Sequence, residues 1–312
     1  MENHGQKKFI FIMNPTAGKH QSIELKEKII NKFLAEGMSD QCIVHLTERP
    51  LHATELARAY SSLYGNNAII FACGGDGTIN EVANGIIGTD AIMSVIPAGT
   101  GNDFVKSLYS NTDSGHVIEN ILKYQLKKID TGTLDERTFV NISSLGFDTI
   151  VGDKAKRIVA KAKFLGGGAY FLAIFVCLLG KNYSRMKYRF ESVDESGKEI
   201  IYENEVDFVL AAIANAQYYG GLFHPCPMAD MSDGFIDICI VDRLSPLKIL
   251  SMIPKYIKGT HINESVVTLY KVKKGVMEGV GESLLVKCDG ESFVKDRIEL
   301  QIFPGSLNVA YY

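Results

Sequence analysis

Residues 1–110 alternate between short apolar runs and longer amphipathic segments, and this alternation restricts the fold more than any other feature. The runs KKFIFIMN, CIVHLT, NAIIFAC and AIMSVIP have the length and composition of buried strands. Residues 22–37, 52–64 and 78–87, which lie between them, have apolar residues at helical spacing. Continuous apolar strands separated by helices predict a parallel sheet covered on both faces, which is a doubly wound α/β domain.

Three glycine-containing stretches follow predicted strands. NPTAG comes after the first strand, GGDGT after the third and PAGTGND after the fourth. The carboxyl ends of parallel strands lie at one edge of a sheet, and such domains bind ligands there. None of the stretches matches the GxxxxGK[ST] or GxGxxG motif. A tight turn is the alternative for any one of them, but three at one edge favour a phosphate-binding site.

The pattern changes from about residue 129 onward. Two stretches, at about 150–180 and 245–258, are helical, and most of the rest alternates as strands do, with turn pairs such as Ser196-Gly197. This pattern predicts a C-terminal antiparallel β-sandwich. We therefore expect an α/β nucleotide-binding domain over residues 1–128 and a β-rich domain with helical insertions over 129–299. The tail at about 300–312 would pack back on the first domain, and the active site would lie in the cleft between the domains.

The overall charge does not favour nucleic acid as a partner, because the net charge is −3 and the isoelectric point is about 6.2. The six cysteines lie far apart without a CxxC pair, which argues against a zinc site or a disulfide framework. The N-terminal stretch MENHGQKKFIFIMNP lacks the long apolar core and the cleavage site of a signal peptide. These features predict a cytoplasmic protein.

The segment FLGGGAYFLAIFVCLLG, residues 164–180, is apolar enough to be compared with a membrane span. Its 17 uncharged residues are at the lower limit for a span, and three glycines weaken its first turn, so a buried or membrane-facing helix is favoured. Basic residues flank it: Lys154, Lys156, Arg157, Lys161 and Lys163 before, and Lys181, Arg185, Lys187 and Arg189 after. Such a helix suits reversible binding to an anionic membrane surface, and a core helix with solvated flanks is the alternative.

The motifs NPTAGK, GGDGTINEVANG and IPAGTGNDF resemble the catalytic domain that diacylglycerol, sphingosine and ceramide kinases share. The stretches GGLFHPCPMADMSDGFIDICIV, VKCDGE and FPGSLNV continue the resemblance in the expected order, so that it covers nearly the whole chain. The compact chain is most similar to the soluble bacterial diacylglycerol kinases. GGDGT alone is less specific, because NAD kinases and phosphofructokinases also carry it.

The resemblance implies that the glycine edge binds ATP together with Mg²⁺. A carboxylate such as that of Asp76 is favourable beside phosphates only if a cation lies between them. Glu81 and Asp103 are further candidates for metal or hydroxyl contacts, with solvation on a helix surface as the alternative for Glu81. Thr78 is expected to cap the helix after GGDG. The residues that motif matching places at the nucleotide are Asn14, Pro15, Thr16, Ala17, Gly18, Thr47, Gly74, Gly75, Asp76, Gly77, Thr78, Ile79, Asn80, Glu81, Thr100, Gly101, Asn102 and Asp103.

Phosphoryl transfer to an alcohol needs a group that accepts the hydroxyl proton. The family's base is the aspartate of VKCDGE, which implies Asp289 here, with Glu291 to orient it or the metal. An ordinary hairpin turn is the alternative for CDGE. In MADMSDGFID, oxygen ligands at this spacing suit Mg²⁺, and the resemblance implies a structural Mg²⁺ held by Asp230, Asp233 and the carbonyl of Phe235. A turn capped by Asp233 is the alternative there.

Together these features predict an ATP- and Mg²⁺-dependent lipid kinase that converts diacylglycerol to phosphatidic acid and binds the inner face of the membrane reversibly. The same transfer to a sphingoid base, another glycerolipid or an isoprenoid alcohol is the first alternative. NAD kinase is disfavoured by VKCDGE, GGLFHP and the apolar segment. A sensor without activity would need a missing base or broken loops, and the sequence shows neither. The resemblance is consistent with a homodimer, which no sequence feature establishes.

Overall fold

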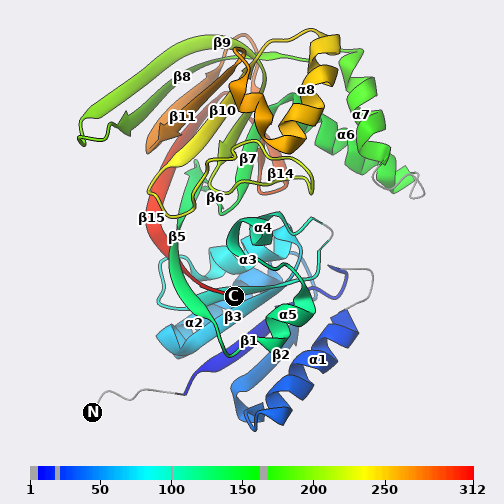
Figure 1. Cartoon of the computed structure of the whole chain (residues 1–312), viewed down its shortest axis with the longest axis vertical. Coiled ribbons are helices and arrows are strands. Elements are labelled where there is room, and N and C mark those ends of the chain that lie inside the picture. The colour runs from blue at the N-terminus through cyan, green and yellow to red at the C-terminus, as the bar shows by residue number, and fades with distance from the viewer. Residues whose placement is uncertain (1–5, 18–21, 100, 162–167) are drawn as a thin grey trace. The chain divides into compact units, whose positions relative to one another are not determined.

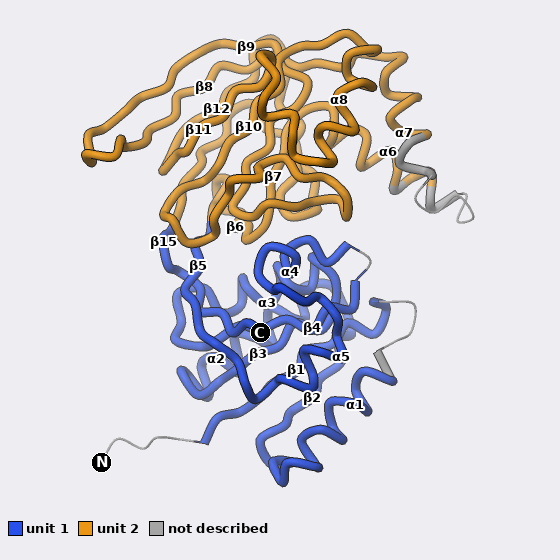
Figure 2. Tube along the Cα trace, viewed as in Figure 1, with its two compact units in different colours: residues 1–131, 303–312 blue, residues 132–302 orange. Residues whose placement is uncertain are grey.

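The computed structural model describes residues 6–17, 22–99, 101–161 and 168–312 (Figure 1). The chain forms two compact units (Figure 2). Unit 1 comprises residues 1–131 and 303–312, and unit 2 comprises residues 132–302. The chain passes from one unit to the other twice, within β5 (Gln125–Leu134) and within β15 (Arg297–Tyr311).

Unit 1 is built on a parallel sheet with the strand order β2-β1-β3-β4. Its strands are β1 (Lys8–Met13), β2 (Cys42–Leu46), β3 (Ala68–Gly74) and β4 (Ile92–Pro97). The last part of β15 extends the sheet in parallel with β4, with Asn308 opposite Ile92. Strands β3 and β4 are buried along their whole length, which explains their continuous apolar sequences.

The helices of unit 1 pack in pairs, α2 on α3 and α1 on α5. Their bounds are α1 (Ser22–Ala35), α2 (His52–Tyr64), α3 (Asp76–Ile86), α4 (Asp103–Leu108) and α5 (Ser114–Glu119), with 3-10 turns at Ser39–Gln41 and Gly65–Asn67. Gly85 lets α3 approach α2 closely, because a Cβ there would lie 2.6 Å from the Cβ of Ala57. The predicted α/β architecture is confirmed.

Unit 2 is an antiparallel β structure, as predicted. Its strands are β6 (Arg137–Phe139), β7 (Ile142–Gly146), β8 (Ser184–Val193), β9 (Glu199–Ala214), β10 (Ile236–Asp242), β11 (Val267–Val272), β12 (Lys274–Gly279), β13 (Leu284–Cys288) and β14 (Glu291–Lys295). The long β9 pairs with β8 along its first part and with β7 and β10 along its second part. Side chains such as Phe190, Phe208 and Ile238 fill the core.

Three helices add an apolar layer to unit 2: α6 (Phe147–Lys161), α7 (Gly168–Leu178) and α8 (Pro246–Lys258), followed by a 3-10 turn at Thr260–Asn263. Val151 of α6, Ile174 of α7 and Ile249 of α8 belong to one buried cluster with Val209 of β9. The helical stretch predicted over 150–180 is thus two helices. Among the described residues, no helix is both long enough and apolar enough to span a bilayer.

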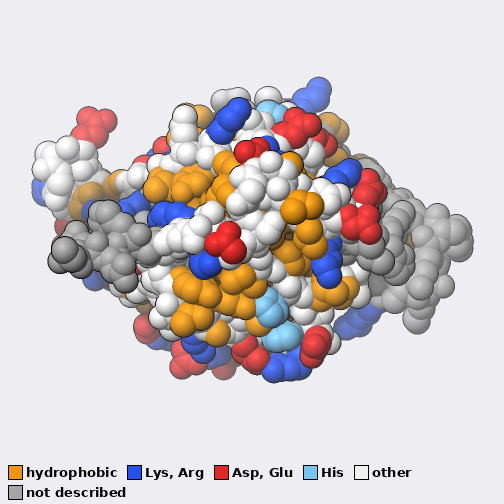
Figure 3. Space-filling view, turned by 90° about the horizontal axis from the view of Figure 1, so that it is seen from below, with side chains coloured by type: hydrophobic (Ala, Val, Ile, Leu, Met, Phe, Trp, Pro, Cys, Tyr) orange, Lys and Arg blue, Asp and Glu red, His pale blue; other side chains and the backbone are white. Residues whose placement is uncertain are grey.

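The surface carries charges of both signs. On the face shown in Figure 3, basic and acidic side chains lie among hydrophobic ones and neither sign forms a continuous field. This distribution agrees with the small net charge of −3. It gives no support for binding of a nucleic acid on this face.

Candidate active site

The loops that follow β1, β3 and β4 meet at the carboxyl edge of the unit 1 sheet. The N–H of Asn14 donates to the carbonyl of Cys73 (3.0 Å), and the N–H of Ala98 donates to the carbonyl of Gly74 (3.3 Å). After β2, the N–H of Thr47 donates to the last carbonyl of β1 (2.8 Å). Backbone hydrogen bonds therefore bring the three glycine-containing stretches and Thr47 together.

Glycines at this edge have two different kinds of surroundings. A Cβ on Gly99 would lie 2.6 Å from the Cα of Gly75, and a Cβ on Gly74 would lie 2.4 Å from the Oγ1 of Thr78. Carbon atoms in contact are normally about 3.5–4.0 Å apart, so packing requires glycine at positions 74 and 99. Gly77 has no neighbouring atom within 4 Å of such a Cβ. Its open backbone is suited to the close approach of a phosphate.

The carboxylate of Asp76 connects two of the loops. Asp76 is the first residue of α3, and its Oδ1 accepts hydrogen bonds from the N–H groups of Asp103 (3.1 Å) and Phe104 (3.3 Å). These are the first residues of α4, so Asp76 satisfies N–H groups that this helix leaves without partners. Burial, followed by the nearby charge of Asp103, raises the pKa of Asp76, and the two hydrogen bonds act in the opposite direction.

The other oxygen of Asp76 lies near a second carboxylate. A Cβ on Gly101 would lie 3.3 Å from the Oδ2 of Asp76 and 3.2 Å from the Oδ2 of Asp103, so both oxygens border one point. Asp103 is buried and pairs with the ammonium of Lys106 at 3.1 Å. Two carboxylates that repel each other beside a glycine-containing loop fit a divalent cation. Since the described residues contain no cluster of three or more metal-binding side chains, phosphates and water would supply the other ligands of Mg²⁺.

The amide side chains of the first and third glycine stretches shape their own loops. The Oδ1 of Asn14 accepts from the N–H of Thr16 (3.0 Å) and from its hydroxyl (2.8 Å). The Oδ1 of Asn102 accepts from the N–H of Gly99 (3.0 Å). These contacts fix the loops without using the backbone N–H groups of α3. Of the other predicted residues, Pro15 and Ala17 are half-buried in the first loop, whereas Gly18 and Thr100 lie outside the described residues.

Helix α3 differs from the prediction at its start. It begins at Asp76 with Gly75 in the N-cap position, and no side chain caps it. Thr78 therefore lies inside the first turn, and the expectation that it caps the helix is wrong. Ile79 is buried, and the Oδ1 of Asn80 accepts from an amide one turn further along the helix (3.1 Å). The side chains of this turn thus pack within unit 1, and the N–H groups of Thr78 and Ile79 donate to the carbonyl of Gly75, which leaves the start of the helix at Asp76 and Gly77 for a ligand.

Glu81 has a packing role that the sequence did not reveal. Its Oε2 accepts from the N–H of Ala53 in the first turn of α2 (3.2 Å). Its main-chain carbonyl accepts from the hydroxyl of Thr54 (2.8 Å). A carboxylate at a helix N-terminus stabilises that helix, so Glu81 holds α2 against α3. A contact between Glu81 and a metal or a hydroxyl stays a prediction.

Asp289 occupies the first position of a two-residue turn between β13 and β14. Its φ is 39° and that of Gly290 is 99°, as in a type I′ hairpin turn. The carboxylate also contacts the chain before β7, because Oδ2 accepts from the N–H of Val140 (2.9 Å) and Oδ1 from the N–H of Asn141 (3.3 Å). CDGE is therefore a hairpin turn whose aspartate is oriented by main-chain groups. Glu291 begins β14 and is exposed.

The predicted second metal loop is stabilised by a lysine. The Oδ1 of Asp233 accepts from the N–H of Phe235 (3.0 Å), and its Oδ2 pairs with the ammonium of Lys271. The same ammonium lies 3.3 Å from the Oδ2 of Asp237. Asp230 is exposed, and its Oδ1 accepts from the N–H group (3.0 Å) and the hydroxyl (2.7 Å) two residues later. The loop thus has the form of a capped turn with a lysine on Asp233, and a magnesium site at Asp230, Asp233 and the carbonyl of Phe235 stays a prediction.

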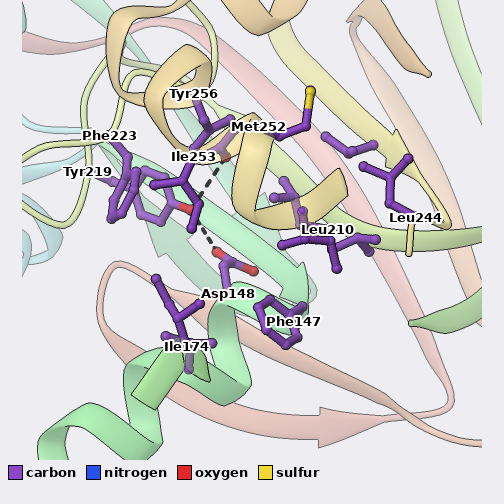
Figure 4. Close-up of a pocket in the computed structure, with 14 residues that line it drawn as sticks. Phe147, Asp148, Ile174, Leu210, Tyr219, Phe223, Leu244, Met252, Ile253 and Tyr256 are labelled. Atoms are coloured by element: carbon purple, nitrogen blue, oxygen red, sulfur yellow. Dashed lines mark hydrogen bonds between the residues drawn. The ribbon is translucent and has the colours of Figure 1, made fainter. Parts of the chain in front are cut away.

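An apolar pocket lies in unit 2 among α6, α7, α8 and β9 (Figure 4). Its cavity volume is about 70 Å³. Ile174 of α7 lines it, so the predicted apolar segment contributes one wall. The residues around the pocket are Phe147, Asp148, Val151, Ile174, Val209, Leu210, Tyr219, Phe223, Val241, Leu244, Ile249, Met252, Ile253 and Tyr256.

Asp148 places a carboxyl group in this apolar pocket. Its Oδ2 accepts from the hydroxyl of Tyr219 (3.0 Å), which lies 3.4 Å from the hydroxyl of Tyr256 (Figure 4). Burial raises the pKa of Asp148, and this effect outweighs Ser144, Tyr219, the N–H of Thr149 and the positive charge of Lys287, which act in the opposite direction. Sequence reasoning missed this group, because Asp148 and Tyr219 are 71 residues apart and no spacing rule connects them.

The outer side of α7 exposes large apolar side chains. Leu172, Phe175 and Val176 are at least one third exposed, and Leu179, just beyond the helix, is 78% exposed. The basic residues that follow are less available than expected, because they form ion pairs. The pairs are Lys181 with Glu282, Arg185 with Asp207, Lys187 with Glu278, and Arg189 with Glu191 and Glu203.

The sequence matches known families along almost its whole length. Residues 8–134 match the diacylglycerol kinase catalytic domain, and residues 141–311 match the YegS C-terminal NAD kinase beta sandwich-like domain. A diacylglycerol kinase of Mycobacterium tuberculosis (strain H37Rv) is 27% identical over 316 residues, which cover 99% of this chain and 96% of that protein. A diacylglycerol kinase of Bacillus subtilis (strain 168) is 27% identical over 289 residues, with coverages of 91% and 90%.

Solved structures share the fold of the whole chain. A diacylglycerol kinase from Bacillus anthracis str. Sterne superposes with a TM-score of 0.71 at 20% identity, covering 98% of this chain and 97% of its own. A second structure from the same organism has a TM-score of 0.77 at 24% identity and covers 98% of both chains. At these identities the likeness shows the two-domain fold.

The matched domains define the class of protein, a phosphotransferase with an alcohol group as acceptor. Within this class, the chain belongs to the diacylglycerol kinase family. The fold class and the enzyme type predicted from the sequence are thereby confirmed.

Proposed function

We propose that this protein transfers the γ-phosphate of ATP to the hydroxyl of diacylglycerol in the presence of Mg²⁺ and releases phosphatidic acid. The observation that carries this proposal is the apolar pocket in unit 2, the unit that also holds Asp289. Hydrocarbon chains gain free energy when such a pocket removes them from water, whereas a polar acceptor such as NAD does not. The names of the curated relatives support diacylglycerol as the lipid.

ATP binds to unit 1 in this proposal. The N–H of Gly77, at the start of α3, donates to the phosphates, whereas those of Thr78 and Ile79 already bond to the carbonyl of Gly75. Asp76 and Asp103 hold Mg²⁺, which when bound neutralises charge on the phosphates. Asp76 serves both the fold and the ligand, because Oδ1 stabilises the start of α4 while Oδ2 faces Asp103.

The acceptor lipid binds to unit 2, and Asp289 accepts the proton of its hydroxyl. The N–H groups of Val140 and Asn141 fix the orientation of the carboxylate, which lowers the entropic cost of aligning it with a hydroxyl. We assign the ATP-binding role to the predicted domain 1–128 and its tail, and the acceptor role to the predicted domain 129–299.

Binding to the inner face of the membrane would be reversible and would use the outer side of α7. Leu172, Phe175, Val176 and Leu179 present an apolar surface that can enter the interfacial region of a bilayer. Because Lys181 and the next three basic residues pair with acidic side chains, we assign the larger contribution to these apolar side chains. A cytoplasmic location and a homodimer stay predictions.

The test is transfer of labelled γ-phosphate from Mg·ATP to diacylglycerol in vesicles that contain anionic lipid, with sphingosine and NAD as parallel acceptors. Asp289→Asn is the variant, and Val294→Ala, at an exposed position of the same hairpin, is the matched control. We expect diacylglycerol to be labelled by the wild type and the control but not by Asp289→Asn. Labelling of sphingosine or NAD in its place would overturn the choice of acceptor.

Loss of activity in Asp289→Asn needs a check of folding, since the carboxylate also binds two main-chain N–H groups. A urea denaturation curve of each variant provides it. If Asp289→Asn is folded, binds ATP and still phosphorylates diacylglycerol at the wild-type rate, Asp289 is not the base.

A further inference from the structure

A lysine lies beside the two carboxylates at the carboxyl edge of the unit 1 sheet. The ammonium of Lys106 is 3.1 Å from the Oδ1 of Asp103. The Oδ2 of Asp103 is 3.2 Å, and the Oδ2 of Asp76 is 3.3 Å, from the position that a Cβ on Gly101 would take. The carboxylate of Asp103 therefore joins the ammonium to the point that both aspartates border.

The two partners of this ion pair differ in their exposure to solvent. The side chain of Asp103 is only 6% exposed, whereas that of Lys106 is 31% exposed. A dissolved anion therefore has access to the lysine side chain but hardly to the aspartate. An ammonium group has three N–H donors, so its hydrogen bond to Asp103 is compatible with a second acceptor.

Helix α4 fixes the position of this ammonium. Asp103 and Lys106 are three residues apart on α4, so their side chains are neighbours on one face of the helix. Asp76 binds the start of α4 through the N–H groups of Asp103 (3.1 Å) and Phe104 (3.3 Å), and the side chain of Phe104 is buried. A cation that is held in advance loses less conformational entropy when an anion binds to it.

The charges at this edge favour a role for the lysine in binding ATP. Two carboxylates lie where the proposed function places the phosphates, and negative charges close to each other repel. The GGDGT stretch has no basic residue, whereas other glycine-rich loops carry a lysine that reaches the β- and γ-phosphates. Lys106 supplies a positive charge from the neighbouring helix, next to one of the two carboxylates.

We propose that Lys106 is a phosphate-binding residue of the ATP site, whose ammonium donates to a phosphate oxygen of ATP while it stays paired with Asp103. This inference deepens the proposed function and rests on it, because it adds a residue to the binding of ATP. Asp103 positions the ammonium through Oδ1, and its Oδ2 faces the point that Asp76 also borders. In the alternative, Lys106 only compensates the charge of Asp103 and does not contact the phosphates.

Equilibrium binding of Mg·ATP and of adenosine tests this role. Lys106→Met removes the charge, and Lys106→Arg keeps it. Loss of one charge-assisted hydrogen bond corresponds to a roughly 10- to 100-fold loss of affinity, so we expect this loss for Mg·ATP in Lys106→Met. The affinity for adenosine should not change, because adenosine has no phosphate. Lys106→Arg should keep most of the affinity for Mg·ATP.

Saturation with Mg²⁺ separates the proposed contact from an effect on the metal. A variant that only binds the metal more weakly regains the wild-type affinity for ATP at saturating Mg²⁺, whereas the loss of a direct contact persists. Lys32→Met is the matched control, since Lys32 pairs with Glu36 at 2.7 Å near the end of α1. It should bind Mg·ATP as the wild type does.

Three results would overturn the role of Lys106. They are wild-type affinity for ATP in Lys106→Met at saturating Mg²⁺, an equal loss of affinity for adenosine and ATP in this variant, and an equal loss of affinity for Mg·ATP in Lys106→Arg. Urea denaturation shows whether the variants fold. Lys106→Gln replaces Lys106→Met if the latter does not, because its amide still donates to Asp103.

The failure of the proposed function can be told apart from the failure of this inference. If the wild type binds Mg·ATP but phosphorylates no lipid, the proposed acceptor is wrong, and the binding measurements still decide the role of Lys106. If the wild type binds Mg·ATP no more tightly than adenosine, the phosphates gain nothing from this edge, and the role of Lys106 is overturned.

Discussion

Gly77 and Gly99 provide a test of where the nucleotide lies, because the structure requires glycine at only one of them. In Gly99→Ala the new Cβ would be 2.6 Å from the Cα of Gly75, about 1 Å too close, and such overpacking costs about 1–3 kcal/mol of the free energy of unfolding. In Gly77→Ala the Cβ meets no atom within 4 Å. Replacing a helical glycine by alanine there should stabilise the fold by up to about 1 kcal/mol.

The effect on ATP should be the reverse of the effect on stability for Gly77→Ala. A Cβ that displaces a phosphate from its N–H donors removes a charge-assisted hydrogen bond worth about 1.5–3 kcal/mol, which is roughly a 10- to 100-fold loss of affinity. Isothermal titration with Mg·ATP and urea denaturation of the same preparations measure both quantities.

Gly85→Ala is the control for a loss of stability alone, since its Cβ would lie 2.6 Å from Ala57 between α2 and α3. It should unfold more easily and keep its affinity for ATP. Wild-type affinity in Gly77→Ala would refute the reasoning, because the phosphates would then not approach this turn.

Three further results are expected. Asp76→Asn keeps an oxygen for the N–H groups at the start of α4, so it should fold normally. It should lose the thermal stabilisation that Mg·ATP gives the wild type. Equal stabilisation of both proteins would exclude Asp76 as a metal ligand. Lys271→Met should lower the free energy of unfolding by about 1–2 kcal/mol, measured in urea, because it removes the partner of the largely buried Asp237. An unchanged value would mean that the ion pairs of Lys271 with Asp233 and Asp237 contribute nothing to stability. The raised pKa of Asp148 means that the folded state binds its proton more tightly than the unfolded state does, so the free energy of unfolding should fall as the pH rises above the usual carboxyl range. Asp148→Asn should remove this component, and identical pH profiles for both proteins would contradict the raised pKa of Asp148.

The parallel sheet was predictable because its strands are buried on both faces and therefore have continuous apolar sequences. Short strands with weak patterns were not. β12, for example, has the sequence KGVMEG, in which a glycine suggests a turn. In the structure Gly275 makes room for a neighbouring ring, since a Cβ there would lie 2.6 Å from the Cδ1 of Phe190. Tertiary packing determines that this segment forms a strand, and a local sequence pattern does not contain that information.

The same difference between local sequence patterns and long-range contacts applies to the candidate site. Glycine clusters at strand ends are local signals, and they led to the edge where β1, β3 and β4 end. The hydrogen bonds of Asp76 to α4 and of Glu81 to α2 join residues 27 or 28 positions apart, which only the folded chain brings together. The lysine that occupies the predicted second metal loop comes from β11, 38 residues after Asp233, and could not be foreseen from the loop itself.

The course of β15 has a consequence for the order in which the chain can fold. Unit 1 includes residues 303–312, and Asn308 and Val309 pair with β4. During synthesis the first four strands leave the ribosome long before this last strand, and the whole of unit 2 is made in between. Until β15 is synthesised, the edge of β4 has no partner strand, and such an unpaired edge can pair wrongly with another chain. β15 covers that edge, so a chain cut before residue 303 should aggregate through β4 even where its glycine-containing loops are intact.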